Sequence, residues 1–187
     1  ETAIGEYPVQ CVRMIQGLIH QYEGRQSFPQ QAATPPSSGL ITPHGGRLVE
    51  HILSDYDMAD LKELPALEVD KYEITDIYQL AVGAYSPLSG FMDREELESV
   101  LAKNRLPGGS VWTMPILLQL PEINLNGFSR GETIALTSNG EIQALIKASD
   151  CYSFDLHKLA NRWFGTADIA HPGVARLLAG TGSFLAG

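Results

Sequence analysis

Cysteine, basic residues and long apolar runs are all scarce in this sequence. Its 187 residues include 2 cysteines, Cys11 and Cys151, which lie far apart in the sequence. Two such isolated thiols are more typical of a protein in a reducing cytoplasm than of a disulfide-stabilised scaffold. No apolar run approaches the ~18 residues that a membrane-spanning helix needs, so we expect no membrane partner.

Basic side chains are outnumbered by acidic ones, with 13 Lys and Arg against 22 Asp and Glu and a net charge of −9. Nucleic acids and anionic membranes need clustered basic residues, so neither is an expected partner. Hydrophobic residues nevertheless make up 44% of the chain, which is enough for a globular domain with a full core. The sequence also lacks an initiator Met and a signal peptide, and we expect it to be a fragment of a longer polypeptide.

The first forty residues contain a predicted helix and a linker. Apolar side chains recur there at helical spacing, at Val9, Val12, Ile15, Ile19 and Tyr22. Pro8 suits the first turn of such a helix, and Gly24 suits its exit. Residues 24–39 are rich in Pro, Gln and Ser, which is typical of a flexible linker. We therefore place an isolated amphipathic helix within residues 1–23 and the main domain at residues 40–187.

The main domain is organised around residues 84–92, whose sequence is Ala84-Tyr85-Ser86-Pro87-Leu88-Ser89-Gly90-Phe91-Met92. Pro87 fixes its own φ, and Gly90 can adopt a φ that other residues avoid. Asp93 and Glu96 then form the pattern of a capping box before a helix from Arg94 to Lys103. We interpret this stretch as a tight turn that enters a helix rather than as a ligand-binding loop.

Short strands and short helices are predicted for the rest of the domain. The strands are Leu40-Ile41, Val111 to Leu120, Thr133 to Thr137, Glu141 to Ala148 and Phe184-Leu185, with a hairpin turn at Asn139-Gly140. The helices run from an N-cap at Thr75 through Ala81, from Asp155 or Ser153 through Phe164 to a stop at Gly165, and onward from His171. This order lacks a βαβ rhythm, so the sequence predicts an α+β fold with a small barrel-like sheet and flanking short helices.

Few residues suggest chemistry. His44 and Arg47 flank Gly45-Gly46 and could bind an anion, but a plain turn with a hydrogen-bonded His44 is favoured because no phosphate-loop pattern occurs. The histidines show no metal-ligand spacing; they are His20, His44, His51, His157 and His171. We expect His171 to form a hydrogen bond at a helix start. From the residues alone we identify no catalytic, cofactor-binding or metal-binding residue.

A first resemblance covers residues 1–23. The octapeptide Glu1-Thr2-Ala3-Ile4-Gly5-Glu6-Tyr7-Pro8 resembles the segment that enters the last helix of the pyruvate kinase barrel. Gln10-Cys11 departs from the usual Glu-Ala of that family, at positions on a helix surface. The metal- and phosphoenolpyruvate-binding residues of the family lie upstream of this segment, so the resemblance implies no kinase activity in this chain. An ordinary amphipathic helix is the alternative.

A second resemblance covers about residues 37–187. Four segments carry it, in this order: Pro43-His44-Gly45-Gly46-x-Leu48-Val49, Tyr85-Ser86-Pro87-Leu88-x-Gly90-Phe91-Met92, Leu106-Pro107-Gly108-Gly109-x-x-Trp112-x-x-Pro115-Ile116 and Phe164-Gly165-Thr166-x-Asp168-x-x-His171-Pro172-Gly173-Val174. Together they resemble the N-terminal PUA-like domain of ATP sulfurylase (sulfate adenylyltransferase). One such segment alone would be a weak signal, whereas four in the family's order are specific.

The second resemblance implies a cytoplasmic enzyme of sulfate assimilation. That family joins sulfate to the adenylyl part of ATP, with magnesium, and releases pyrophosphate. Its reacting groups lie in the following domain, on a Gln-x-Arg-Asn segment, a paired-His segment and a Gly-Arg-Asp segment, and none of the three occurs in this sequence. The resemblance therefore implies a domain that is inactive alone, with ATP and magnesium bound elsewhere in the parent enzyme.

The expected partners are the downstream catalytic domain of the same polypeptide and further copies in a homo-oligomer. Two alternatives stay open at this point. The chain could be a non-catalytic interaction module that keeps this fold as a scaffold. It could also belong to a pyruvate kinase that carries this domain at its C-terminal end.

Overall fold

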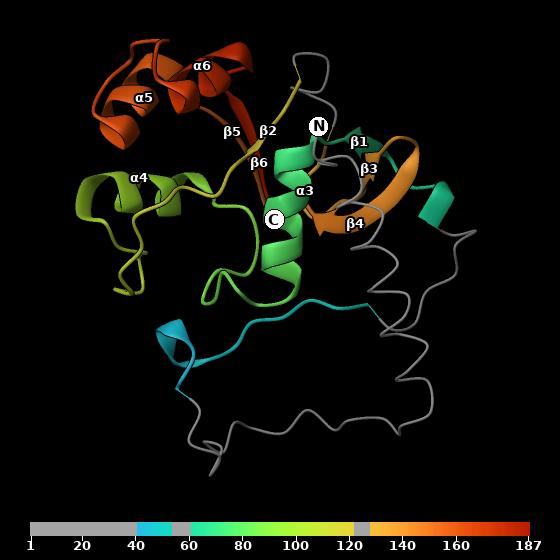
Figure 1. The fold of residues 1–187 in the computed structure, drawn as a ribbon. Helices are drawn as coiled ribbons and strands as arrows, with labels where there is room; N and C mark the ends of the chain where they lie inside the picture. The colour runs from blue at the N-terminus through green and yellow to red at the C-terminus, as the bar shows by residue number, and fades with distance from the viewer. Residues whose placement is uncertain (1–40, 54–60, 122–127) are drawn as a thin grey trace, which may run out of the picture. The chain divides into compact units, whose positions relative to one another are not determined.

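The computed structural model describes residues 41–53, 61–121 and 128–187 (Figure 1). The predicted helix within residues 1–23 and the linker at 24–39 lie outside the described residues. Backbone contacts divide the chain into two units, the larger of which contains Pro43–Ile52 and Asp57–Gly187. The fold described below is that of the larger unit. The boundary predicted at residue 40 stays a prediction.

The larger unit combines short helices and short strands. The helices are η1 (His44–Gly46), α3 (Lys71–Ala81), α4 (Arg94–Lys103), α5 (Leu156–Phe164) and α6 (Pro172–Ala179). The strands are β1 (Ala66–Glu68), β2 (Leu118–Gln119), β3 (Thr133–Ser138), β4 (Glu141–Lys147), β5 (Asp150–Ser153) and β6 (Ser183–Ala186). The predicted α+β fold class is confirmed.

The strands form two sheets of three, in the orders β1-β3-β4 and β2-β6-β5. β1 runs parallel to β3, and the other pairs are antiparallel. β3 and β4 form the predicted hairpin, and Asn139 and Gly140 both have positive φ in its turn. Just past the end of β4, the Ser149 N–H donates to the carbonyl of Ala186 in β6 at 2.8 Å. Because Asp150 pairs with Ala186, this bond continues the ladder between β5 and β6 within the second sheet. The chain passes directly from the first sheet to the second at this point.

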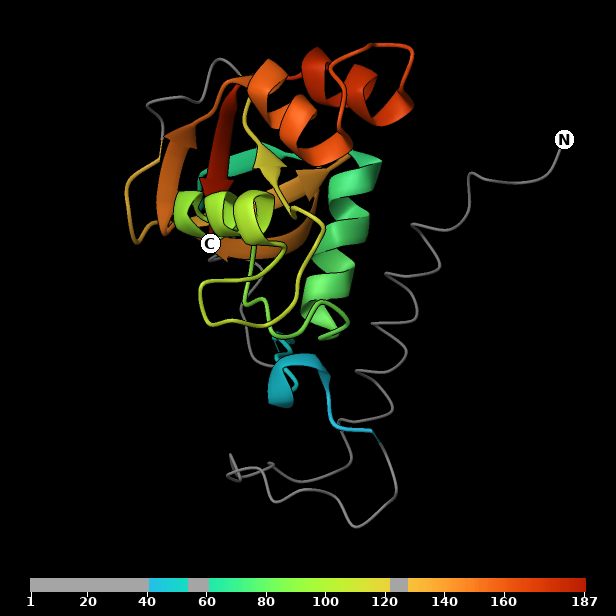
Figure 2. The same cartoon turned by 90° about the vertical axis from the view of Figure 1, so that its left-hand side faces the viewer.

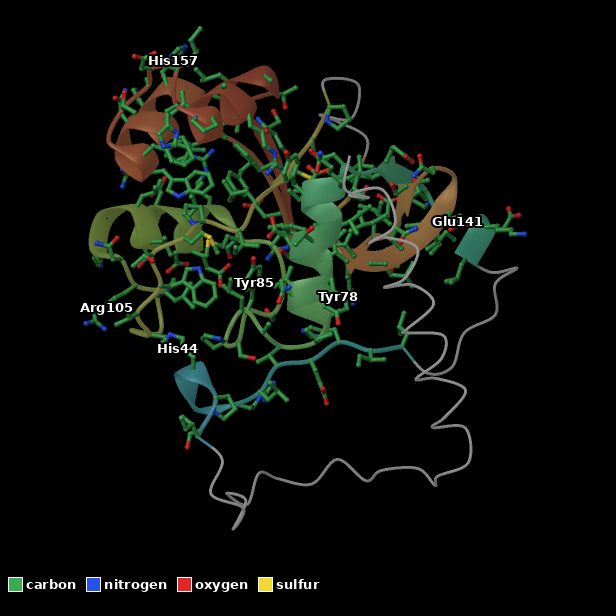
Figure 3. All side chains as sticks on the ribbon, in the orientation of Figure 1. His44, Tyr78, Tyr85, Arg105, Glu141 and His157 are labelled. Carbon is green, nitrogen blue, oxygen red and sulfur yellow. The ribbon has the colours of Figure 1, made fainter. Side chains whose placement is uncertain are left out.

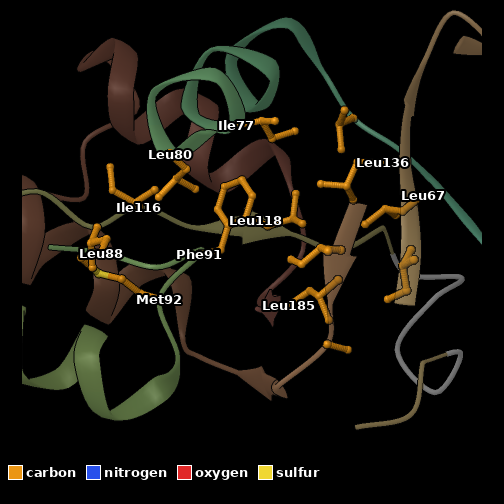
Figure 4. Packing of buried hydrophobic residues seen from close by; sticks show 14 of the residues in the cluster. Leu67, Ile77, Leu80, Leu88, Phe91, Met92, Ile116, Leu118, Leu136 and Leu185 are labelled. Carbon is orange, nitrogen blue, oxygen red and sulfur yellow. The ribbon is translucent and has the colours of Figure 1, made fainter. Parts of the chain in front are cut away.

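Two apolar cores join the helices to the two sheets. In the first, Ile77 and Leu80 of α3 pack with Leu118, Leu136 and Leu185 from three different strands (Figure 4). The second core lies where α4, α5 and α6 meet the second sheet, and its fully buried members include Leu97, Leu159, Val174 and Phe184. Burying each such side chain contributes about 2 kcal/mol to the free energy of unfolding. α5 and α6 pack on each other and α4 packs on α5, as Figure 2 shows.

Local capping patterns correctly predicted the starts of two helices and the end of one. The Asp93 carboxylate accepts from the Glu96 N–H at 2.8 Å, and the Glu96 carboxylate accepts from the Asp93 N–H at 3.2 Å. Asp155, rather than Ser153, caps α5 by accepting from the Lys158 N–H at 3.0 Å. Gly165 ends α5 in the left-handed conformation, with φ at 73°.

The predicted N-cap at Thr75 is wrong. The N-cap of α3 is instead Asp70, which forms a second capping box with Glu73. The Asp70 carboxylate accepts from the Glu73 N–H at 2.8 Å, and the Glu73 carboxylate accepts from the Asp70 N–H at 2.7 Å. Thr75 instead lies inside the helix, where its hydroxyl donates to the Lys71 carbonyl at 3.0 Å. The acidic pair satisfies the backbone N–H donors of Asp70, Tyr72 and Glu73 together, which a single threonine cannot do.

The long strand predicted from Val111 to Leu120 is also wrong, since only the two residues of β2 are in a strand. The backbone before β2 forms hydrogen bonds to other segments instead. The Trp112 N–H donates to the Asn104 carbonyl, and the Ile116 carbonyl accepts from the Met92 N–H. Pro115 adds a position without an N–H donor. The predicted strand at Leu40-Ile41 is not observed at Ile41, and Leu40 lies outside the described residues. β1 and β5 were not predicted.

Candidate functional site

Three of the four motif segments meet in space, and we call residues 43–49, 84–92 and 104–115 together the loop junction. The His44 Nε2 lies 2.7 Å from the Val111 carbonyl oxygen. A carbonyl only accepts, so Nε2 carries the proton in this bond. The His44 ring also lies 6.2 Å from that of Trp112, centre to centre. His44 is thus the hydrogen-bonded turn residue that the sequence favoured over an anion ligand.

Close packing explains the glycine and serine at the centre of the loop junction. Gly45 has a φ of 75°, and a Cβ there would lie 2.6 Å from the Cβ of Pro87. The buried Ser86 hydroxyl accepts from the Val49 N–H at 2.9 Å and donates to the Gly83 carbonyl at 2.6 Å. The segment after residue 43 is therefore fastened directly to the turn that the sequence placed at the centre of the domain.

A hydrogen bond between Tyr85 and Asp76 fastens the loop junction to α3. The Tyr85 hydroxyl donates to Asp76 Oδ1 at 3.0 Å, and the Tyr85 ring meets Trp112 edge-on at 6.0 Å. Burial, with the Asp76 charge, raises the pKa of Tyr85 to about 12. Burial also raises the pKa of Asp76, although the Tyr85 hydroxyl and Arg176 oppose it. A phenol with so high a pKa stays protonated at neutral pH, so it serves as a donor rather than as a base.

The fourth motif, residues 164–174, forms the turn between α5 and α6. In Figure 3, α5 is marked by His157 and lies at the opposite end of the unit from His44. The predicted turn is present: the Asp168 N–H donates to the Thr166 hydroxyl at 3.1 Å, and the Ala170 N–H donates to the Asp168 carboxylate at 2.9 Å. His171 Nδ1 accepts from the Val174 N–H at 3.3 Å, as expected for a helix start. This motif therefore does not join the loop junction.

Aromatic packing completes the α5–α6 turn. Phe164 stacks on Trp163 with ring centres 4.4 Å apart and an angle of 18° between the planes. The centre of the His171 ring lies 4.9 Å from that of the Phe164 ring. A Cβ at Gly173 would lie 2.9 Å from the Phe164 ring, so a larger residue does not fit there without movement. The motif residues thus have packing roles.

An ion pair between α3 and α6 was not found from the sequence. Arg176 Nη2 lies 3.4 Å from Asp70 Oδ2, and the guanidinium lies 4.0 Å from the centre of the Tyr72 ring. The pair is half exposed, so its electrostatic contribution is about 1 kcal/mol or less. Its partners are more than one hundred residues apart, and no local spacing signals such a contact.

Two open clefts flank α4. The first has a volume of about 430 Å³, and its charged lining includes Asp93, Arg94, Arg130 and Asp150. The second has a volume of about 510 Å³ and is lined by Glu95, Lys103 and Arg105 among others. Both signs of charge line each cleft. The first lining also contains the hydroxyl of Ser149, and the second that of Ser99.

Metal-binding clusters and membrane-spanning helices are both absent from residues 41–53, 61–121 and 128–187. No three His, Cys, Asp or Glu side chains gather there in a way that would hold a metal ion. In the same part of the chain, no helix combines the length and the apolar character needed to cross a membrane.

Comparison with protein families matches residues 41–187 to a model described as a PUA-like domain. The sulfate adenylyltransferase of Hyperthermus butylicus is 40% identical over 140 residues, which are 73% of this chain and 36% of the relative. That of Symbiobacterium thermophilum is 36% identical over 143 residues, 74% of this chain and 36% of the relative. The chain thus spans little more than a third of the length of these curated relatives.

A longer relative and a solved structure extend this pattern. A protein of Sorangium cellulosum named probable bifunctional SAT/APS kinase 2 is 37% identical over 154 residues, 80% of this chain and 26% of the relative. The structure of a hexameric APS kinase from Thiobacillus denitrificans matches with a TM-score of 0.56 and 28% identity. That match covers 79% of this chain and 26% of the solved chain.

Proposed function

Because the chain belongs to the PUA-like domain family, we propose that it is the N-terminal, non-catalytic domain of a sulfate adenylyltransferase. One observation carries the proposal. The matched residues account for nearly all of the larger unit, yet they fill only 36% of the sulfate adenylyltransferases that they resemble. The remainder of such an enzyme is long enough for at least one further domain.

The parent enzyme in this proposal is a cytoplasmic transferase that makes adenylyl sulfate. A sulfate oxygen attacks the α-phosphorus of ATP, the bond to the β-phosphate oxygen breaks, and pyrophosphate leaves with that electron pair. In this proposal ATP and magnesium bind to the following domain, where the family carries its reacting groups. The segments that carry the reacting groups in the family are not found in this sequence.

The role of this domain is then to pack against the catalytic domain of its own polypeptide and against other copies. The APS kinase whose structure matches is hexameric, which supports a homo-oligomeric parent. The loop junction and the two cores give the domain its rigidity. A rigid accessory domain can hold the reacting groups of its neighbour in place without touching the substrates.

A chimera tests this proposal. Residues 41–187 would replace the matched region of the Hyperthermus butylicus enzyme, beside a variant that lacks the region altogether. We expect the chimera to support sulfate-dependent exchange between ATP and pyrophosphate, the deletion variant to lose it, and the purified chain to show none. Exchange by the purified chain would overturn the non-catalytic assignment. A folded chimera no more active than the deletion variant would show that the two domains are not equivalent.

The first residues keep a second candidate open. The pyruvate-kinase-like octapeptide at residues 1–8 supports a parent kinase that carries this domain at its C-terminal end. The coding sequence on either side decides between the candidates. A Gln-x-Arg-Asn segment after Gly187 supports the transferase, and a kinase barrel before Glu1 with nothing catalytic after Gly187 supports the kinase. A stop codon directly after Gly187, with no barrel upstream, supports a non-catalytic interaction module.

A further inference from the structure

Gly187 is held by the turn that the sequence placed at the centre of the domain. The Phe91 N–H donates to the Gly187 carbonyl at 3.0 Å, and the Gly187 N–H donates to the Phe91 carbonyl at 3.3 Å. Gly187 directly follows β6, the central strand of its sheet, and all four residues of β6 are buried. We call Ser89–Met92 together with Gly187 the exit clasp.

The exit clasp requires glycine at position 90 for one reason, which is space. A Cβ on Gly90 would lie 1.6 Å from the carbonyl oxygen of Gly187, which is far closer than any real contact. The φ of Gly90 is outside the left-handed region, so conformational freedom is not what the position needs. The glycine in this motif therefore lets two backbones touch.

Both sides of the exit clasp are anchored in the core. Met92 is fully buried, its N–H donates to the Ile116 carbonyl at 3.0 Å, and its carbonyl accepts from the Tyr152 hydroxyl at 2.9 Å. Figure 4 shows Phe91 and Met92 in the same apolar cluster as Leu185 of β6. Gly187 is also confined from the side of β4, since a Cβ there would lie 2.5 Å from the Lys147 carbonyl oxygen. The backbone at Gly187 is thus restrained from two directions.

We propose that the exit clasp fixes the direction in which the chain leaves β6 and so sets the orientation of the domain that follows Gly187. The proposal rests on the proposed function, because only a longer protein has such a domain. A domain attached through a free linker samples many orientations, and fixing it in one of them costs entropy. A restrained exit removes part of that cost. Gly90 is then a positioning residue, which acts through the backbone of Gly187.

Distances between two spin labels test the direction of exit in this chain itself. One label is placed by His157→Cys on the exposed surface of α5, which points away from the unit in Figure 3. The other is placed on a cysteine added directly after Gly187, with Cys11→Ser and Cys151→Ser removing the native thiols. We expect a narrow distance distribution in this background and loss of the narrow peak after Gly90→Ala, with the thermal transition of the domain retained.

Gly108→Ala is the matched control. A Cβ at Gly108 would meet nothing within 4 Å, and its φ is also outside the left-handed region, so the narrow peak should persist. A broad distribution in the background protein, or a narrow one in folded Gly90→Ala, would overturn the proposal. If Gly90→Ala does not fold, the distance distribution of the background protein alone tests the proposal. A narrow peak then supports it, and a broad distribution overturns it. The labels report no catalysis, so this outcome is independent of the chimera.

Discussion

The loop junction joins segments that are far apart in the chain, whereas the α5–α6 turn is built from close neighbours. His44 bonds to a carbonyl 67 residues away, and Val49 bonds to a hydroxyl 37 residues away. At the α5–α6 turn, the capping bonds of His171 and Asp168 span 3 and 2 residues. Ordering distant segments costs more loop-closure entropy than ordering neighbours. The stability of the loop junction therefore depends more strongly on each of its contacts.

The two regions also use glycine differently, although the backbone angles are alike. Gly45 has a φ of 75° and Gly165 a φ of 73°. Pro87 lies against Gly45, while nothing within 4 Å would meet a Cβ at Gly165. Positive φ alone is thus the requirement at the end of α5. At the loop junction, the requirement is positive φ together with close approach.

The largest expected effect comes from Gly45→Ala, measured against Gly165→Ala. Each substitution places alanine in the left-handed region, at a cost of about 1–2 kcal/mol. Gly45→Ala adds overpacking against Pro87, which typically costs a further ~1–3 kcal/mol. Urea denaturation should show the larger loss of unfolding free energy for Gly45→Ala. Equal losses would mean that Pro87 moves aside freely, and that the two regions differ less than their contacts suggest.

A smaller effect is expected from Ser86→Ala. The substitution leaves the Val49 N–H and the Gly83 carbonyl without their partner in a buried position, so the free energy of unfolding should fall by about 2 kcal/mol. Ser89 is in the same loop but exposed, and Ser89→Ala should change stability by less than about 0.5 kcal/mol. Denaturation midpoints of the two variants provide the check. Equal midpoints would show that water replaces the lost hydroxyl.

The elements predicted correctly from the sequence are those fixed by local spacing. The capping box of Asp93 and Glu96 and the stop at Gly165 both follow from residues within one turn. β1 was not predicted from the sequence, because it has only three residues and pairs with a strand about seventy residues further along the chain. No local pattern in a sequence signals such a pairing.

The same limit applies to the loop junction and the exit clasp. The sequence predicts a turn at Ser86-Pro87 and a hydrogen-bonded His44, since both follow from the residue types. It does not reveal that Gly187 approaches Gly90, or that Tyr85 reaches Asp76. A glycine in a sequence shows that space or an unusual φ is needed, but not which segment fills the space.

The smallest effect is a difference in pH dependence between the two regions. In α3, beside the loop junction, burial raises the pKa of Asp76 above 3.8. Between 3.8 and the raised value, the native state holds more protons than the unfolded state, so the free energy of unfolding falls as the pH rises. At the start of α5, the Lys158 N–H lowers the pKa of Asp155 below 3.8. The stability that Asp155 contributes is therefore present above 3.8 and is lost as the pH falls through its native pKa.

Asparagine variants separate these two contributions, because the side-chain amide keeps a hydrogen-bond acceptor but does not titrate. Relative to the parent chain, Asp76→Asn should gain stability as the pH rises above 3.8, and Asp155→Asn should lose stability as the pH rises towards 3.8. Burial also raises the pKa of Glu73 and Glu96, but both are present in all three proteins and cancel in the difference. Urea denaturation across the acid range measures both differences. If the two variants deviated from the parent in the same direction, the pKa of Asp76 would be lowered rather than raised. The hydrogen bond from Tyr85 would then affect that pKa more than burial does, and Asp76 would be open to solvent.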